Sequence, residues 1–239
     1  MTFGSLFSGI GGMDLGLERA GMVCRWQCEI DPYARRVLAK HWPEVTRYGD
    51  IRDLDDRLER VDLIAGGFPC QPVSLAGKRR GRDDERWLWP ELARIVRLLR
   101  PRFVLVENVA ALAFRGLGDV LGDLCALGYD AEWSAVSACA VGAPHTRERL
   151  FLLAHADREL GPSRLRLLAE HDRQGPLQPP GDRERRRAWL ATVPGSGGSL
   201  DGTADWLDRL RVVGNACVPQ VAECVGRRIM AAAGEDEAR

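Results

Sequence analysis

The sequence has 239 residues, of which 45% are hydrophobic and 28% charged, and its formal net charge at pH 7 is zero. This length can bury the core of one large domain, with or without a small appendage. No apolar run approaches the roughly eighteen residues of a membrane-spanning helix, and the first residues lack the layout of a signal peptide. We therefore expect a cytoplasmic protein that does not enter a membrane.

The cysteines and the distribution of charge exclude further classes of protein. The seven cysteines are odd in number and form no CxxC pair, so we expect no metal site and interpret most of them as small buried hydrophobes. Zero net charge argues against a surface that is positive throughout, although residues 78–102 and 164–187 are rich in arginine. Arginine suits phosphate and guanine contacts, but a GC-rich genome would also enrich it, and both explanations stay open.

Apolar strands alternate with amphipathic helices over the first 156 residues. Asp31 is the expected cap of the second helix, with Pro32 at its first position. This alternation predicts an α/β fold with a doubly wound, mostly parallel sheet. The expected strands are Thr2–Ser8, Val23–Ile30, Asp62–Gly67, Phe103–Val106, Tyr129–Ala138 and Arg149–Ala154, and the expected helices are Met13–Ala20, Pro32–His41, Arg86–Arg100 and Leu117–Leu127.

The pattern changes after residue 156. Residues 157–205 contain prolines, a charge run and a Gly/Ser tract, which indicate a loop-rich insert or small second domain. Order is expected again at Leu207–Val213 and in a final helix at about Val218–Ala232. The sequence thus divides into 1–156, 157–205 and 206–239, and its last part is expected to return to the first.

The first strand ends in a glycine-rich turn, Phe7–Gly12. Open parallel sheets bind ligands beyond the carboxyl ends of their strands, and glycines let the backbone approach a ligand closely. Glu29, about twenty positions further on, is placed to hold ribose hydroxyls, and Asp50 could accept from an adenine amino group. A plain tight turn remains an alternative, and a dinucleotide would fit these residues as well as S-adenosylmethionine.

Cys70 lies between two prolines in a glycine-flanked loop directly after a buried strand. That position holds its thiol away from the core, and thiolates are strong nucleophiles. The next strand, with the apolar part Phe103–Val106, ends in Glu107-Asn108-Val109. Its tip carries the acid Glu107, so a thiol and an acid are expected to meet over one ligand site. This pair suits addition to an electron-poor ring, in which the thiolate attacks carbon and the acid protonates a ring nitrogen. A structural cysteine and a helix-capping carboxylate are the simpler alternatives.

Six segments, in order, resemble the motifs of the cytosine-5 DNA methyltransferases, most closely those of compact bacterial and phage enzymes. The pair formed by Pro69-Cys70-Gln71 and Glu107-Asn108-Val109, correctly ordered with the glycine turn, is the most specific part. The six are Leu6–Gly21 (LFSGIGGMDLGLERAG), Glu29–Ala34 (EIDPYA), Gly66–Gly81 (GGFPCQPVSLAGKRRG), Glu107–Val109 (ENV), Val141–Phe151 (VGAPHTRERLF) and Gly214–Val221 (GNACVPQV).

The resemblance implies a role for each matched residue in methyl transfer from S-adenosylmethionine to C5 of cytosine, without a metal. Cys70 would add to C6, Glu107 would hydrogen-bond and protonate N3, and Arg147 and Arg149 would steady the cytosine. On the cofactor side, Phe7 would stack on adenine, Glu29 would bind ribose, Asp50 would bind the adenine amine, and Asn215 would lie near the methionine end. The remaining cofactor-binding candidates are Gly9, Gly11, Gly12, Ile30, Ile51 and Ala216.

The implied partner is double-stranded DNA, in which C6 of a stacked cytosine is out of reach, so the base must rotate out of the helix. The loop after Cys70 is the expected lid over the flipped base, and a merely solvated charged loop is the alternative. We expect a monomer, and a cognate restriction endonuclease stays an open possibility. The DNA-binding candidates in this loop are Gln71, Ser74, Lys78, Arg79, Arg80 and Arg82.

The sequence departs from the family pattern in three places. The stretch that normally precedes the Gly-Asn motif and orders the target-recognition region is not identifiable. His145 stands where the arginine motif opens with glutamine, and the expected target-recognition region, 157–205, is very short. Three other functions remain to be weighed: a nicotinamide oxidoreductase, which leaves Cys70 and Glu107 without a role, a tRNA cytosine methyltransferase of the same fold, and a DNA-binding module without activity. Methylation assays with duplex DNA and tRNA separate the DNA enzyme from the tRNA enzyme, and cofactor binding without methylation of any DNA would support the inactive module.

Overall fold

The computed structural model describes residues 1–70, 84–143, 145–156 and 216–237. Within these ranges the chain forms a seven-stranded sheet of order β3-β2-β1-β4-β5-β7-β6. The strands are β1 (Thr2–Leu6), β2 (Val23–Cys28), β3 (Thr46–Tyr48), β4 (Leu63–Gly66), β5 (Phe103–Val109), β6 (Asp130–Ser137) and β7 (Glu148–His155). The helices are α1 (Gly12–Arg19), α2 (Pro32–His41), η1 (Ile51–Asp53), α3 (Trp89–Leu99), α4 (Leu112–Arg115), α5 (Leu117–Ala126), η3 (Ala138–Val141) and α8 (Pro219–Glu237).

Strands β3, β2, β1, β4 and β5 run parallel, whereas β7 pairs antiparallel with both β5 and β6. The predicted α/β fold with a mostly parallel sheet is confirmed. At the end of the sheet only the short helix η3 and a turn join β6 to β7, and such a link suits antiparallel neighbours.

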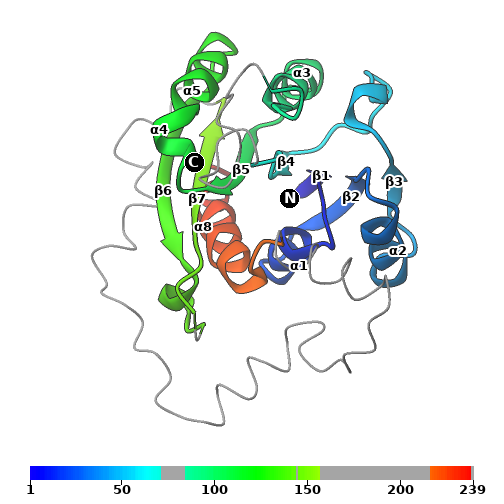
Figure 1. Cartoon of the computed structure of the whole chain (residues 1–239), viewed down its shortest axis with the longest axis horizontal. Coiled ribbons are helices and arrows are strands. Elements are labelled where there is room, and N and C mark those ends of the chain that lie inside the picture. Colours follow the sequence, from blue (N-terminus) through cyan, green and yellow to red (C-terminus); the bar gives the residue numbers. More distant parts are fainter. Residues whose placement is uncertain (71–83, 144, 157–215, 238–239) are drawn as a thin grey trace.

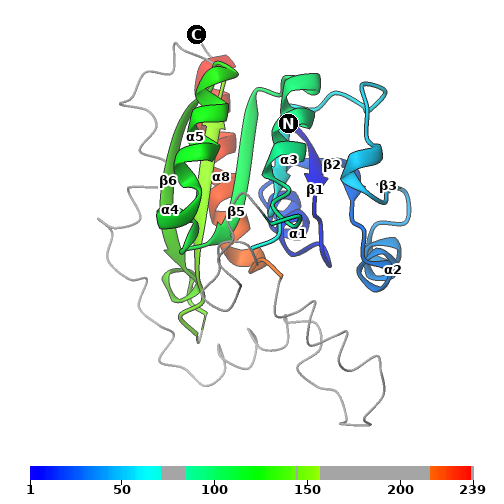
Figure 2. The same cartoon turned by 45° about the horizontal axis from the view of Figure 1, so that its top comes forward.

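Helices cover both faces of the sheet (Figures 1 and 2). On one face, α3 and α5 pack with strand residues such as Ile64 and Val104 in one core cluster. On the other face, α1 and α8 pack with Phe3 and Leu105 in a second cluster. These two cores fix the carboxyl ends of the parallel strands, where the loops that follow β1, β2 and β4 begin.

Glycines in the interface let α8 lie directly against α1. A Cβ on Gly16 would lie 2.4 Å from the Pro219 carbonyl oxygen, and a Cβ on Gly226 would lie 2.8 Å from the Cβ of Ala20. The last helix therefore packs on the first in spite of the long stretch of sequence between them. The division of the chain at residues 156 and 205 stays a prediction, since residues 157–215 lie outside the described part.

Most element boundaries lie within a few residues of those expected. Helix α2 begins at Pro32, and the Asp31 carboxylate caps it by accepting from the amides of Tyr33 and Ala34. Helix α3 begins three residues later than expected, at Trp89, after a turn in which Asp84 accepts from the Arg86 amide. Strand β3 and helix α4 were not predicted, because they contain only three and four residues.

Strand β5 continues beyond its apolar part, Phe103–Val106, to Val109. The antiparallel strand β7 pairs with Glu107, Asn108 and Val109, so their backbone groups are satisfied within the sheet. Glu107 therefore lies near the end of the strand, as the sequence predicted. Its side chain still lies at the carboxyl-terminal edge of the sheet, beside the ends of β1 and β4.

Candidate active site

A pocket of about 350 Å³ lies at the carboxyl ends of β1, β2, β4 and β5. Parallel sheets of this kind bind ligands at this edge. Of the residues singled out from the sequence, those that line the pocket are Phe7, Gly9, Gly12, Glu29, Ile30, Asp50, Ile51, Cys70, Glu107, Arg149 and Ala216.

The glycine turn forms one wall of the pocket. Gly9 has a φ of +56°, and a Cβ there would meet nothing within 4 Å, so its backbone faces open space. Phe7 also has a positive φ, of 55°, although it is not glycine. A conformation of this kind costs about 1–3 kcal/mol and is concentrated at functional sites. The predicted residue Gly11 lies outside the pocket lining and instead packs against Trp42 as the N-cap of α1.

Glu29 joins the turn after β1 to the end of β2. Its Oε2 accepts from the Gly9 amide at 2.7 Å, and its Oε1 accepts from the Asp31 amide at 2.8 Å. Each carboxylate oxygen retains a further lone pair for a ligand hydroxyl. Next to it, the Ile30 side chain is 62% exposed although it lines the pocket. An uncovered apolar side chain in a cleft is typical of a surface that contacts a ligand.

The Cys70 loop and Glu107 approach each other at the far side of the pocket. Cys70 is half-buried and lines it, whereas Cys24 and Cys28 are buried in the core. Burial raises the pKa of Cys28 to about 12. Four of the seven cysteines are half-buried and Cys125 is exposed, so the interpretation of most cysteines as buried was wrong.

Two contacts hold this loop against β5. A Cβ on Gly67 would lie only 2.9 Å from Glu107 Oε2, so the backbone at residue 67 packs directly on the carboxylate. The Asn108 side-chain amide donates to the Phe68 carbonyl oxygen at 3.1 Å. Asn108 was not proposed as a site residue, although it stands inside the ENV tripeptide, and that tripeptide is the signal that could have identified it.

Glu107 is buried beside two arginines. Burial raises the pKa of its carboxyl group, and the charges of Arg149 and Arg147 oppose that rise. Arg149 Nε lies 3.0 Å from Glu107 Oε1. Arg147 does not line the pocket, but its charge acts on Glu107, Cys70 and Cys217. Cys217, another pocket residue that sequence reasoning missed, has a pKa raised by burial.

His145 lies beside this arginine pair, where the related motif has glutamine. Its Nδ1 accepts from the Arg147 amide at 3.3 Å. A glutamine side-chain oxygen could accept the same bond. The departure from the family pattern at residue 145 is therefore compatible with the geometry around Arg147.

Some predicted residues lie outside the described part of the chain. These are Gln71, Ser74, Lys78, Arg79, Arg80, Arg82 and Asn215, together with the segments 157–205 and Leu207–Val213. Among the described residues, no helix has both the length and the apolar character needed to cross a membrane. Within the same ranges, no three His, Cys, Asp or Glu side chains are grouped as metal ligands would be.

Comparison with known proteins agrees with this geometry. The model of the family described as C-5 cytosine-specific DNA methylase matches residues 1–172. The chain belongs to this family. The resemblance inferred from the six motifs is confirmed, and the pocket lies where the family motifs converge.

Two members of the methylase family resemble this chain in sequence, but the match covers less than half of each of them. The chain is 37% identical over 164 residues to a type II methyltransferase of Herpetosiphon aurantiacus, M.HgiCII, a match that covers 63% of this chain and 36% of that protein. It is 38% identical over 159 residues to M2.BsuMI of Bacillus subtilis, with 63% and 41% covered. The chain thus matches well under half of these two relatives.

A solved structure shares the fold. DNMT2 of Spodoptera frugiperda superimposes with a TM-score of 0.57 over 67% of this chain and 51% of its own length, at 24% identity. At this identity the likeness supports the sheet architecture alone.

Proposed function

We propose that this member of the methylase family is a DNA (cytosine-5)-methyltransferase that uses S-adenosylmethionine. The observation that carries the proposal is the meeting of Cys70, Glu107 and Arg149 in one pocket with the glycine turn and Glu29. A nicotinamide oxidoreductase would account for the turn and Glu29 but would give the thiol and the buried acid no task.

The pocket fits S-adenosylmethionine by its chemistry. The exposed Ile30 and the half-buried Phe7 offer apolar surface for adenine, and Glu29 offers acceptors for the ribose hydroxyls. The open backbone at Gly9 and the lining residue Ala216 leave room for the rest of the ligand. When bound, S-adenosylmethionine would supply an electrophilic methyl group.

The chain's own residues would activate the base. The Cys70 thiolate adds to C6 of a cytosine rotated into the pocket, while Glu107 donates a hydrogen bond and then a proton to N3. The electrons displaced from the C5=C6 double bond then make C5 nucleophilic, as in an enamine. After C5 is methylated, a base removes the C5 proton, and the electrons of that C–H bond re-form the C5=C6 double bond and expel the Cys70 thiolate. N3 returns its proton to Glu107. Arg149 would keep the Glu107 carboxyl group directed at the base.

Binding to duplex DNA is part of the proposal. Base rotation requires contacts outside the pocket, for which we propose the loop residues Gln71, Ser74, Lys78, Arg79, Arg80 and Arg82, with target recognition in 157–205. Asn215 is proposed for the methionine end of the cofactor, beside its described neighbour Ala216. A cognate endonuclease and the monomeric state belong to the same hypothesis.

The decisive test expresses the chain in cells without cytosine methylation and maps methylcytosine by bisulfite sequencing. We expect one short methylated sequence, which Cys70→Ser abolishes. Purified wild type should form a covalent adduct with duplex DNA that carries 5-fluorocytosine at that sequence, and Cys70→Ser should not. Methylation of tRNA alone would favour the RNA enzyme, and full turnover by Cys70→Ser would refute the assignment of the nucleophile.

A further inference from the structure

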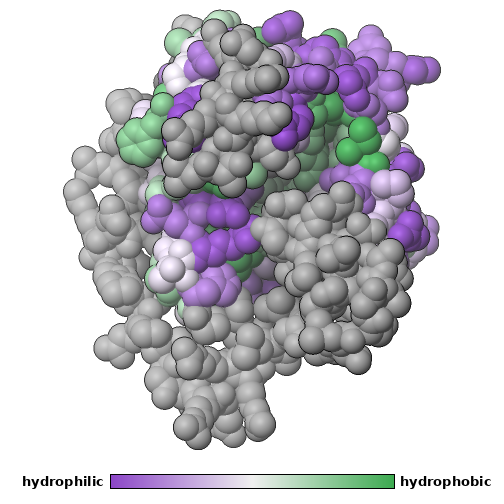
Figure 3. All heavy atoms as spheres, in the orientation of Figure 1, coloured by the Kyte–Doolittle hydropathy of each residue, from purple (hydrophilic) through white to green (hydrophobic). Residues whose placement is uncertain are grey.

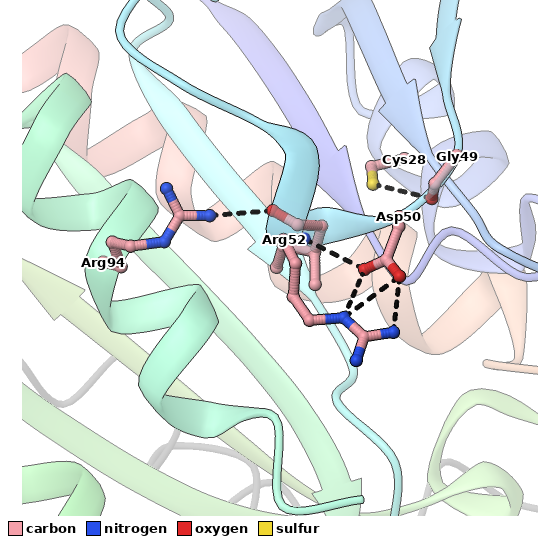
Figure 4. Close-up of polar contacts among 6 residues, drawn as sticks. Cys28, Gly49, Asp50, Arg52 and Arg94 are labelled. Atoms are coloured by element: carbon pink, nitrogen blue, oxygen red, sulfur yellow. Dashed lines mark hydrogen bonds and ion pairs between the residues drawn. The ribbon is translucent and has the colours of Figure 1, made fainter.

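The turn that carries Asp50 and Ile51 into the pocket is held by side chains from other elements (Figure 4). Both residues line the pocket, and the helix η1 begins directly after Asp50. At the start of the turn, Cys28 Sγ at the end of β2 donates to the Gly49 carbonyl oxygen at 3.3 Å. Contacts from helix α3 and from the Arg52 amide fix the rest of the turn.

Arg94, on helix α3, is the main tether. Its Nη2 donates to the Ile51 carbonyl oxygen and its Nη1 to the Leu54 carbonyl oxygen, both at 2.8 Å. Its Nε is bound to Glu91 Oε2 at 2.7 Å, which orients the guanidinium. The planar fork of arginine matches two acceptors at once, which an ammonium group cannot do with the same geometry. In Figure 3, which has the orientation of Figure 1, the surface at the upper right, where the β3–β4 connection lies, is mostly hydrophilic.

The Asp50 carboxylate itself is directed by the turn. Its Oδ1 accepts from the Arg52 amide at 3.0 Å, as the cap of η1, so the side chain follows the backbone that Arg94 holds. Arg94 does not line the pocket, although Asp50, Ile51 and Arg52 do. Any effect of Arg94 on a ligand must therefore pass through the turn.

We propose that Arg94 is a positioning residue for the nucleobase end of the pocket, which sets the preference for a base with an exocyclic amine by fixing the Asp50 carboxylate. The inference rests on the proposed use of S-adenosylmethionine. It concerns selectivity rather than the chemistry of methyl transfer, so binding alone can test it. Arg94→Lys keeps the charge but removes the planar fork that reaches both carbonyl groups.

The test measures calorimetric affinities of S-adenosylhomocysteine and S-inosylhomocysteine, in which the adenine amine is replaced by a carbonyl oxygen. Wild type should prefer the adenosyl ligand by about tenfold, the worth of one charge-assisted hydrogen bond. Arg94→Lys should remove most of that preference, chiefly by weakening the adenosyl ligand. Arg97→Lys, on an exposed position of the same helix, should leave the ratio unchanged.

A double-mutant cycle separates positioning from a general structural effect. Asp50→Ala should abolish the preference, and adding Arg94→Lys to it should change the ratio less than twofold. Equal loss of both ligands in Arg94→Lys, with wild-type preference kept, would overturn the inference while leaving the proposed function intact. If Arg94→Lys melts at low temperature, Arg94→Gln serves as the second variant. A wild type that binds neither ligand would instead refute the proposed function.

Discussion

Arg149 Nε lies 3.0 Å from Glu107 Oε1, across the antiparallel pair of strands β5 and β7. The two residues are not directly opposite each other, since Glu107 faces Phe151 in the register and Arg149 faces Val109. The ion pair is therefore a diagonal contact on one face of the sheet. It directs a buried carboxyl group toward the pocket and opposes the rise in its pKa.

Glu107→Gln should lower the rate of methyl transfer by about 10²–10⁴-fold, because glutamine can donate a hydrogen bond to N3 but cannot transfer a proton. Affinity for S-adenosylhomocysteine should stay within about twofold of wild type. Burial raises the pKa of Glu107, so the protonated acid persists to higher pH than in an exposed glutamate. The wild-type rate should therefore fall as pH rises through that pKa. Single-turnover rates and calorimetry check both, and parallel losses of rate and affinity would indicate a structural role instead.

Gly67→Ala tests the contact between the Cys70 loop and Glu107. The added Cβ would lie 2.9 Å from Glu107 Oε2, closer than carbon and oxygen normally approach, so the carboxylate or the loop must move. We expect the rate of adduct formation with 5-fluorocytosine DNA to fall at least tenfold, because displacing the reacting groups from their productive geometry lowers the rate strongly. Binding of S-adenosylhomocysteine should change little.

Gly118→Ala is the matched control for that substitution. Gly118 lies in helix α5, and a Cβ there would meet nothing within 4 Å. Alanine should stabilise the helix by up to about 1 kcal/mol and leave adduct formation unchanged. Unchanged adduct formation in both variants would mean that the loop does not need to pack against Glu107 for the reaction.

The sequence predicted those parts of the site that depend on local pattern and parallel topology. The cap of α2 could be predicted because Asp31 directly precedes Pro32 and the helix in the sequence. Cys70 and Glu107 meet because parallel strands β4 and β5 bring their carboxyl ends to one edge. Both features follow from the local sequence pattern and from the alternation of strands and helices.

The parts that were missed depend on contacts between distant elements. The antiparallel pairing of β5 with β7 joins segments some forty residues apart. Arg94 contacts the turn at Ile51 only because α3 packs beside η1, and an arginine on an amphipathic helix otherwise looks like an ordinary surface residue. Cys217 reaches the pocket only through the return of α8 to α1.

Arg52→Ala should strengthen binding of S-adenosylhomocysteine by up to about fivefold. Arg52 makes four contacts to the Asp50 carboxylate, from its amide, Nε and Nη2, which match the roughly four acceptor positions of a carboxylate. An adenine amine must therefore displace one of these donors. The Arg52 side chain is 62% exposed, and solvent-exposed ion pairs contribute little, so the gain is modest.

Arg57→Ala is the control for the Arg52 variant. Asp55 and Arg57 repeat the same Asp-x-Arg arrangement outside the pocket lining. This substitution should leave affinity unchanged. Weaker binding in Arg52→Ala alone would show that Arg52 contacts the ligand itself, contrary to the competition argued from its hydrogen bonds.

Asp14→Asn should change how stability depends on pH. Asp14, in the first turn of α1, is fully buried, and burial raises its pKa to about 6 in spite of hydrogen bonds from Ser5 Oγ and Gln27 Nε2, both at 2.7 Å. Between about pH 4 and 6 the native state holds a proton that the unfolded state has released. Stability therefore falls as pH rises through this window and is constant above it.

The rise in pKa from 3.8 to about 6 corresponds to a loss of about 3 kcal/mol of unfolding free energy across that window. Asparagine stays neutral, can still accept from Ser5, and can pair with Gln27 after its amide turns. Relative to wild type, Asp14→Asn should thus become more stable by about 2–3 kcal/mol between pH 4 and pH 7.5, as measured by urea unfolding. Asp56→Asn removes an exposed carboxylate as the control. A difference between Asp14→Asn and wild type that is the same at both pH values would show that Asp14 is ionised in the folded protein throughout.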